Sequence, residues 1–222
     1  MSLPIRGQRL KQDLFGHVEL IAEAAPMRIR RDTRTAHPSL RWLARHLLQR
    51  ERHALTYLAG RSEGLSPAIP QLLYSDDLTL ERSWIEGVPM HEAKPRDRRY
   101  FVDALRLLRR LHAEGVTHND LAKEPNWLVT ATGRAAIVDF QLARCAPRGG
   151  LLFRALAHND LRHLYKHKRT YCPEALTSRQ RRLLANPSTL SKIWRWAVKR
   201  PYHFITRRLF GWQDREGRYE RH

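Results

Sequence analysis

Three oxygen-bearing side chains between residues 118 and 143 constrain this chain more than any other feature. Asp120 and Asn126 stand shortly after the end of a predicted helix, and Asp139 directly follows the apolar run Ala-Ala-Ile-Val. That run and an earlier Leu-Val predict two short strands around a turn at residues 132–133. We therefore expect the three side chains at one end of a hairpin. Carboxylate and amide oxygens in this number suit magnesium, with phosphate completing the ligand shell.

The order of these residues follows a known pattern. Residues 118–120 (HND) match a His-Arg-Asp loop, Asn126 matches a metal-binding asparagine, and residues 139–141 (DFQ) match an Asp-Phe-Gly triplet. In these motifs the chain resembles the protein-kinase-like superfamily, and within it the small bacterial and RIO-like kinases, including the lipopolysaccharide-core sugar kinases. The strong match covers about residues 100–143, and a weaker one reaches back to Glu51.

The resemblance implies an α+β fold, a minimal two-lobed kinase. We expect a small β-rich lobe at residues 1–90, with a hinge near 84–87, and a helical lobe at residues 91–222. Backbone groups of the hinge, where Glu86 lies, would bind the adenine of ATP. The implied reaction is transfer of the γ-phosphoryl group of ATP to a hydroxyl group, with Mg2+ as the metal.

The same resemblance implies the roles of the catalytic residues. Asp120 would orient the attacking hydroxyl and accept its proton, and Lys123 would steady the moving phosphoryl group. Asn126 and Asp139 would hold magnesium. Such chemistry depends on positioning and on neutralising charge rather than on covalent help from the protein.

The chain departs from the kinase pattern within these motifs. Asn126 follows Asp120 by six positions, whereas the pattern has five, so the loop carries one extra residue. Pro125 stiffens that loop. Asn119 replaces the arginine that commonly pairs with a phosphorylated loop, and Gln141 replaces glycine, which leaves the triplet less free to flip. We interpret the chain as a kinase that is not switched in the usual way.

Two other kinase features are missing. Gly16 stands alone where a glycine-rich loop is expected, and no lysine occupies the strand that would contact the phosphates. Arg28 and Arg30 share one face of that predicted strand, and Arg31 lies on the other. We favour Arg31 as the phosphate-binding cation, paired with Glu51, although solvated strand arginines are the alternative. Arginine is bulkier than lysine and forked, so a nucleotide-binding pseudokinase is a second hypothesis.

Periodicity predicts the remaining elements. Ser39 is the expected N-cap of a first helix with an apolar stripe at Leu40, Leu43, Leu47, Ala54 or Leu55, and Leu58. Gly115 is expected to end a second helix. Asp160 is expected to brace the catalytic loop or to lie exposed. The expected strands are 15–20, 27–31, 71–74 and 78–85, and the expected helices are 39–59, 97–114, 151–168 and a short one after a capping box at 177–180.

The charge balance points to anionic partners. The 222 residues include 41 Lys or Arg against 22 Asp or Glu, a formal net charge of +19. Such a chain attracts polyanions. Aromatic and basic residues interleave over 192–222, a composition that suits an anionic membrane surface, nucleic acid, or a tail packed on the protein. The cysteines Cys145 and Cys172 form no metal or disulfide pattern, and we expect a cytoplasmic protein, with the inner face of the membrane as an alternative site.

The functional hypothesis is an ATP- and Mg2+-dependent phosphotransferase, in first place a RIO-like serine/threonine protein kinase. The acceptor would be an acidic or phosphorylated partner, either a protein or a lipid-linked saccharide, and a kinase of a sugar hydroxyl in the lipopolysaccharide core is the alternative. Binding of nucleic acid through charge alone is a further, less favoured alternative.

Overall fold

The computed structural model describes residues 8–22, 26–61 and 65–185. The protein is of the α+β class, and its sheets are antiparallel. By contacts the chain divides into two compact units, residues 1–175 and residues 176–222. The first unit contains every residue of the predicted site. The expected lobe boundary at residue 90 stays a prediction.

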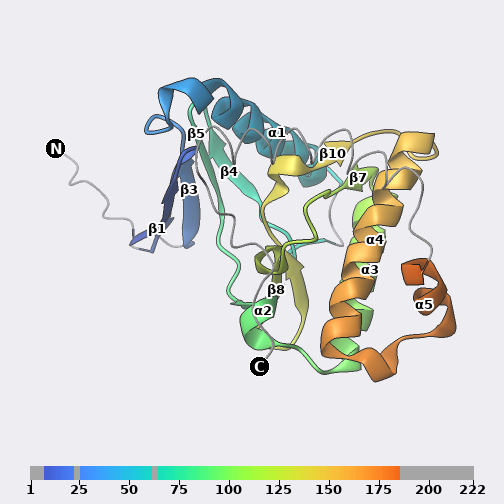
Figure 1. Ribbon diagram of the computed structural model, residues 1–222. Helices are drawn as coiled ribbons and strands as arrows, with labels where there is room; N and C mark the ends of the chain where they lie inside the picture. Colours follow the sequence, from blue (N-terminus) through green and yellow to red (C-terminus); the bar gives the residue numbers. More distant parts are fainter. Residues whose placement is uncertain (1–7, 23–25, 62–64, 186–222) are drawn as a thin grey trace. The chain divides into compact units, whose positions relative to one another are not determined.

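A five-stranded sheet of order β1-β2-β3-β5-β4 fills the N-terminal part of the first unit (Figure 1). The predicted strands at 15–20, 27–31, 71–74 and 78–85 are confirmed, although the last one ends at Ser83, and the strand at residues 8–13 was not among the predicted ones. The strands are β1 (Gln8–Asp13), β2 (Gly16–Ile21), β3 (Arg28–Asp32), β4 (Leu72–Ser75) and β5 (Thr79–Ser83).

The register of β3 and β5 assigns the arginines to two faces. Arg30 pairs with Glu81 and Arg31 with Leu80. Because side chains alternate along a strand, Arg28, Arg30 and Glu81 share one face, while Arg31 lies on the other. By the same alternation Arg82, the next residue after Glu81 on β5, lies on the opposite face, together with Arg31. The predicted separation of the strand arginines is therefore confirmed.

Helix α1 (Arg41–Ala59) confirms the first predicted helix and corrects two details. A 3-10 turn, η1 (Pro38–Leu40), precedes it, and the N-cap is Leu40 without a side-chain hydrogen bond. Ser39 is not the cap, because it lies inside that turn, where its hydroxyl bonds the His37 ring at 2.7 Å.

The buried stripe of α1 differs from the predicted one in the first half of the helix, where it lies one position later in the sequence. Its members are Ala44, Leu48, Glu51, Ala54, Leu55 and Leu58. This face carries the fully buried carboxylate Glu51 as well as apolar residues. A buried charge requires countercharges, and the neighbouring strands supply them.

The chain leaves β5 through the irregular residues 84–87 and enters a helical region. A sheet of order β6-β8-β9 contains the predicted hairpin, which is confirmed. Its strands are β6 (Val88–Pro89), β8 (Trp127–Val129) and β9 (Ala135–Ile137). Ile85 packs against Leu128 and Ala136 of this sheet, so the linking segment is anchored to the hairpin.

Helices α3 (Arg98–Ala113) and α4 (Leu151–Tyr171) lie side by side and confirm two further predictions (Figure 1). Asp97 caps α3 by accepting from the Arg99 amide at 2.8 Å. Gly115 follows the helix with φ +79°, where an added Cβ would meet the Ala146 carbonyl oxygen at 2.8 Å. Only glycine satisfies both conditions, as the sequence indicated.

The remaining elements of the first unit are short. They are α2 (Met90–Ala93), β7 (Val116–Thr117), η2 (Glu124–Asn126), η3 (Phe140–Leu142), β10 (Arg144–Cys145) and η4 (Pro173–Ala175). Strands β7 and β10 pair antiparallel, so the segment after Asp139 returns to the start of the loop that carries Asp120.

The second unit is described over α5 (Ser178–Ala185). The predicted capping box is confirmed: the Gln180 amide donates to the Thr177 hydroxyl at 3.3 Å, and the Thr177 amide donates to the Gln180 side chain at 3.2 Å. The basic aromatic segment 192–222 lies outside the described residues. No helix in the described part of the chain combines the length and the apolar character needed to cross a bilayer.

Candidate active site

Asp120 and Asn126 meet directly on the loop between β7 and β8. The Asn126 amide nitrogen donates to the Asp120 carboxylate at 3.1 Å and to its backbone carbonyl at 3.0 Å. The 3-10 turn η2, which contains Pro125, accommodates the extra loop residue and brings Asn126 back to Asp120. Lys123 completes this group, with Nζ 3.1 Å from Oδ2 of Asp120.

The electrostatic surroundings prepare Asp120 to take up a proton. Burial raises the pKa of the Asp120 carboxyl above its ordinary value, Lys123 offsets part of this effect, and the charge of Asp139 raises the pKa further. A carboxylate that acts as a base is more effective when its pKa lies closer to neutral.

Asp139 follows β9 with backbone φ 66° and ψ 74°, in the left-handed region. Asn119, on the catalytic loop, has φ 66° as well. Such conformations are rare for residues other than glycine and persist where the surroundings hold them. They turn the backbone sharply on both sides of the site. Backbone bonds join the two segments, since Val138 donates to the Asn126 carbonyl at 3.0 Å.

Cations surround the Asp139 carboxylate. Arg31 approaches its Oδ1 to 3.8 Å. Loss of hydration would raise the pKa of Asp139, but the charges of Arg31, Arg82 and Lys123 outweigh that effect and hold the pKa below its ordinary value. Asp139 therefore ionises more readily than Asp120.

The predicted pairing of Arg31 with Glu51 is present in the structure. Nε of Arg31 lies 3.4 Å from Oε2 of Glu51, whose side chain is fully buried. Sequence reasoning missed a second partner: Nε of Arg82, on β5, lies 3.1 Å from Oε1 of the same carboxylate. Two arginines from two strands thus share one glutamate of α1. Strand alternation from Glu81 could have revealed Arg82.

Gln141 also contacts Arg31, which the sequence did not predict. In the amide orientation that its neighbours favour, the Gln141 oxygen accepts from the Arg31 guanidinium, with Nε 2.9 Å away. Arg50 of α1 donates to the Leu142 and Ala143 carbonyls at 2.9 and 3.1 Å. The segment after Asp139 is therefore tied to β3 and to α1.

Asp160 of α4 braces the loop that carries Asp120, which confirms the first of the two alternatives predicted for it. Its buried carboxylate accepts from the backbone amides of His118 and Asn119 at 2.8 and 2.9 Å, and His112 lies 3.2 Å away. Nε2 of His118 contacts the Val138 carbonyl at 3.0 Å. The two histidines hydrogen-bond within the protein.

The chemistry of Asp139 and Asn126 fits a magnesium ion that receives its other ligands from phosphate and water. Oδ1 of Asp139 is buried and accepts no hydrogen bond from any residue in the described part of the chain. No group of three or more His, Cys, Asp or Glu among those residues is arranged for a metal. One carboxylate and one amide could supply two oxygen ligands to such a metal, and phosphate could supply others.

Of the predicted site residues, Glu86 makes none of the contacts described above for the candidate site. It is exposed in the irregular segment 84–87. Gly87 in the same segment lies against the hairpin, because a Cβ there would meet Leu128 Cβ and the Val129 carbonyl oxygen at 3.1 Å. The segment passes close to β8, and its predicted role in nucleotide binding stays a prediction.

No protein-family model and no curated protein matches this chain. The assignment of function therefore depends on the residues themselves and on their arrangement.

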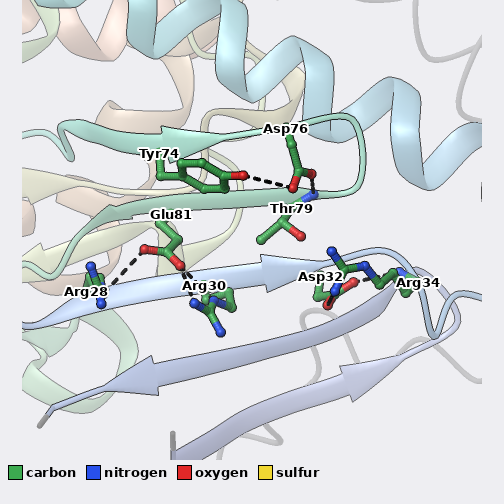
Figure 2. Close-up of a pocket in the computed structure, with 8 residues that line it drawn as sticks. All are labelled: Arg28, Arg30, Asp32, Arg34, Tyr74, Asp76, Thr79 and Glu81. Carbon is green, nitrogen blue, oxygen red and sulfur yellow. Dashed lines mark hydrogen bonds and ion pairs between the residues drawn. The ribbon is translucent and has the colours of Figure 1, made fainter. Parts of the chain in front are cut away.

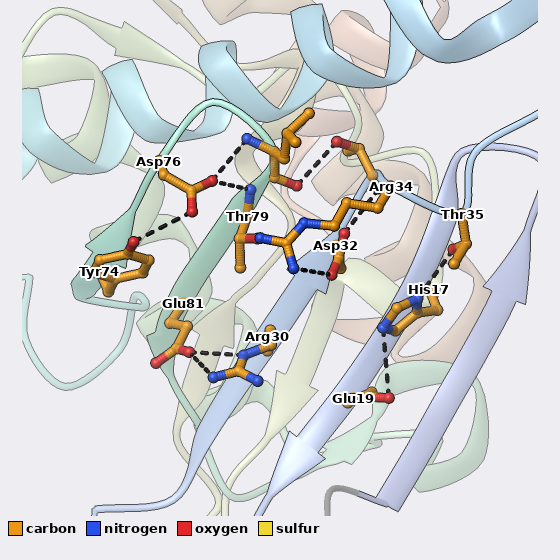
Figure 3. Close-up of polar contacts among 12 residues, drawn as sticks. His17, Glu19, Arg30, Asp32, Arg34, Thr35, Tyr74, Asp76, Thr79 and Glu81 are labelled. Atoms are coloured by element: carbon orange, nitrogen blue, oxygen red, sulfur yellow. Dashed lines mark hydrogen bonds and ion pairs between the residues drawn. The ribbon is translucent and has the colours of Figure 1, made fainter. Parts of the chain in front are cut away.

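A separate polar cluster occupies the other face of the five-stranded sheet. It lines a cavity of about 480 Å3 (Figure 2). Glu81 is bound there by two arginines, Arg30 at 2.6 Å and Arg28 at 3.3 Å. Asp76 accepts from the amides of Leu78 and Thr79 at the turn between β4 and β5 (Figure 3). The acidic and basic groups of this face pair mainly with one another.

Proposed function

We propose that this protein is an ATP- and Mg2+-dependent phosphotransferase with a minimal two-lobed, kinase-like fold. The contact between Asp120 and Asn126, with Lys123 on the same carboxylate, is the observation that carries the proposal. Support also comes from the buried Glu51 of α1, which pairs with a cation of β3. A sheet followed by a helical region, with the catalytic loop and Asp139 on one hairpin, agrees with that fold.

In the proposed reaction the oxygen of an acceptor hydroxyl bonds to the γ-phosphorus of ATP. The bond from that phosphorus to the bridging oxygen breaks, and ADP leaves with its electron pair. Asp120 orients the hydroxyl and accepts its proton, for which its raised pKa suits it. Lys123 neutralises charge on the moving phosphoryl group.

Asn126 and Asp139 would hold magnesium, which when bound neutralises phosphate charge. Arg31 is the proposed cation for the nucleotide phosphates, and its guanidinium already contacts Asp139 and Gln141. Residues 84–87, including Glu86, would contact the adenine. The proposed acceptor is a serine or threonine hydroxyl of a protein, as in RIO-like kinases, and acidic targets suit the net charge of +19.

A specific observation favours a second candidate, a pseudokinase that binds nucleotide without turnover. Arg31 contacts the carboxylate that would bind the metal, at 3.8 Å, and arginine replaces the smaller lysine of active kinases. If Arg31 stayed in this position, magnesium would bind poorly at Asp139.

The test measures transfer of labelled γ-phosphate from ATP to the protein itself, to dephosphorylated casein and to lipopolysaccharide core sugars. Wild-type protein should label itself or casein, and Asp120→Asn, which keeps the side-chain shape, should lose labelling by at least about a hundredfold. Labelling of the core sugars alone would identify a sugar kinase. Nucleotide binding without labelling would identify a pseudokinase, and the absence of both would refute the proposal.

A further inference from the structure

One buried carboxylate of α1 faces two arginines of the neighbouring sheet. Glu51 is fully buried, and its two oxygens face different guanidinium groups, Arg82 at 3.1 Å and Arg31 at 3.4 Å. Neither oxygen accepts a hydrogen bond within the described chain, so ion pairing alone holds the carboxylate. A single arginine would neutralise it, and the pair therefore carries one positive charge more than Glu51 needs.

The two arginines differ in their surroundings. The Arg82 side chain is 10% exposed and has the shorter contact with Glu51. The Arg31 side chain is 18% exposed and also contacts Asp139 and Gln141, so it lies at the edge of the candidate active site. Arg82 is thus the fixed partner of Glu51, and Arg31 is the partner that faces the proposed phosphate position.

On the basis of the proposed function, we infer that Arg82 is a positioning residue that keeps Glu51 neutralised and so releases Arg31 to bind the phosphates of ATP. Without Arg82, a move of Arg31 toward a nucleotide would leave a buried carboxylate without a countercharge. With Arg82 in place, Arg31 can exchange Glu51 and Asp139 for phosphate oxygens. Asp139 then becomes available for the metal.

The other face of the same sheet supplies a matched control. Glu81 is bound by Arg28 and Arg30 in the same one-to-two arrangement, on the same pair of strands (Figure 2). That face points away from Glu51 and Asp139. A change in Arg30 disturbs a comparable ion pair in the sheet but leaves the candidate active site intact.

The experiment measures the affinity of Mg·ATP by calorimetry, together with the melting temperature of each variant. Arg82→Gln should weaken binding by about tenfold, within the range of ordinary couplings between sites. Adding Glu51→Gln to that variant removes the buried charge and frees Arg31 again. The double variant should therefore bind Mg·ATP at least about threefold more tightly than Arg82→Gln alone. Arg82→Lys should retain more affinity than Arg82→Gln, and Arg30→Gln should bind Mg·ATP as the wild type does.

The outcomes separate this inference from the proposed function. If wild-type protein binds no nucleotide, the proposed function and the inference are both wrong. If it binds, and Arg82→Gln binds equally well, the inference alone is wrong. A double variant that is as weak as Arg82→Gln would also contradict it, because a purely structural role predicts no recovery. If Arg82→Gln does not fold, the comparison of Arg82→Lys with the double variant decides.

Discussion

Replacing Asp160 with asparagine should destabilise the protein and loosen the catalytic loop. The Asp160 carboxylate accepts from two consecutive backbone amides, at His118 and Asn119, in a fully buried position. An asparagine oxygen can accept only one of these bonds, and its NH2 group would face the other N–H. The variant therefore loses one bond to a charged acceptor and leaves one buried donor unsatisfied.

The magnitude follows from the two losses. A hydrogen bond to a charged group contributes about 1.5–3 kcal/mol, and an unsatisfied buried donor costs about 1–3 kcal/mol. Because the lost bond and the unsatisfied donor are partly the same effect, the two costs do not add in full, and we expect a net loss of about 3 kcal/mol. For a chain of this size that corresponds to a decrease in melting temperature of about 6–12 °C. In hydrogen exchange, the amides of His118 and Asn119 should lose their protection first.

Asp97→Asn is the matched control. Asp97 also accepts from a backbone amide, that of Arg99 at 2.8 Å, but it does so at the exposed start of α3. Asparagine caps a helix about as well as aspartate, so this variant should change the free energy of unfolding by less than about 0.5 kcal/mol. If Asp160→Asn melts within about 1 °C of the wild type and of this control, the bracing role is refuted.

Three further predictions concern the fold and the pH dependence of the site. Gly115→Ala should cost more stability than Gly133→Ala, because both have positive φ but a Cβ meets a carbonyl oxygen only at Gly115; equal denaturation midpoints would contradict this. The rate of phosphotransfer should fall on acidification at a pH above the ordinary aspartate pKa, because the pKa of Asp120 is raised. Lys123→Met should move that fall to higher pH, because Lys123 lowers the pKa of Asp120. If the fall stays at the same pH or moves to lower pH, Asp120 is not the base. The pH dependence of stability should have opposite signs for the two aspartates. Because the pKa of Asp120 is raised, the wild type loses stability as pH rises above the ordinary aspartate pKa, and Asp120→Asn becomes relatively more stable over that window. Because the pKa of Asp139 is lowered, its carboxylate contributes stability that is lost as pH falls below the ordinary aspartate pKa. Urea denaturation as a function of pH measures both effects.

Local sequence patterns predicted much of the fold. Alternation gave the strands and the faces of Arg30 and Arg31, and glycine chemistry gave the end of α3 at Gly115. The predicted N-cap of α1 was wrong, because Pro38 begins a 3-10 turn that includes the expected cap residue, Ser39. The buried stripe of that helix was displaced by one position over its first half, because the side of the helix that is covered depends on contacts with segments far away in the sequence.

The candidate site was predictable where it depends on neighbours in the sequence. Asp120, Lys123 and Asn126 lie on one loop, and motif spacing was enough to bring them together. Arg82 and the contact of Gln141 with Arg31 were missed, because these contacts join segments far apart in the sequence. Strand alternation indicates the face on which Arg82 lies, but its pairing with Glu51 also depends on how α1 packs against the sheet.

The central claim is that Asn126 and Asp139 hold magnesium against the phosphates of ATP. The most direct measurement is the affinity for ATP with and without Mg2+, in wild-type protein and in Asp139→Asn. Wild-type protein should bind ATP more tightly with Mg2+, and the variant should lose at least about tenfold of that gain while keeping its Mg2+-independent binding. Equal Mg2+ dependence in the two proteins, or no binding of ATP by the wild type, would contradict the account.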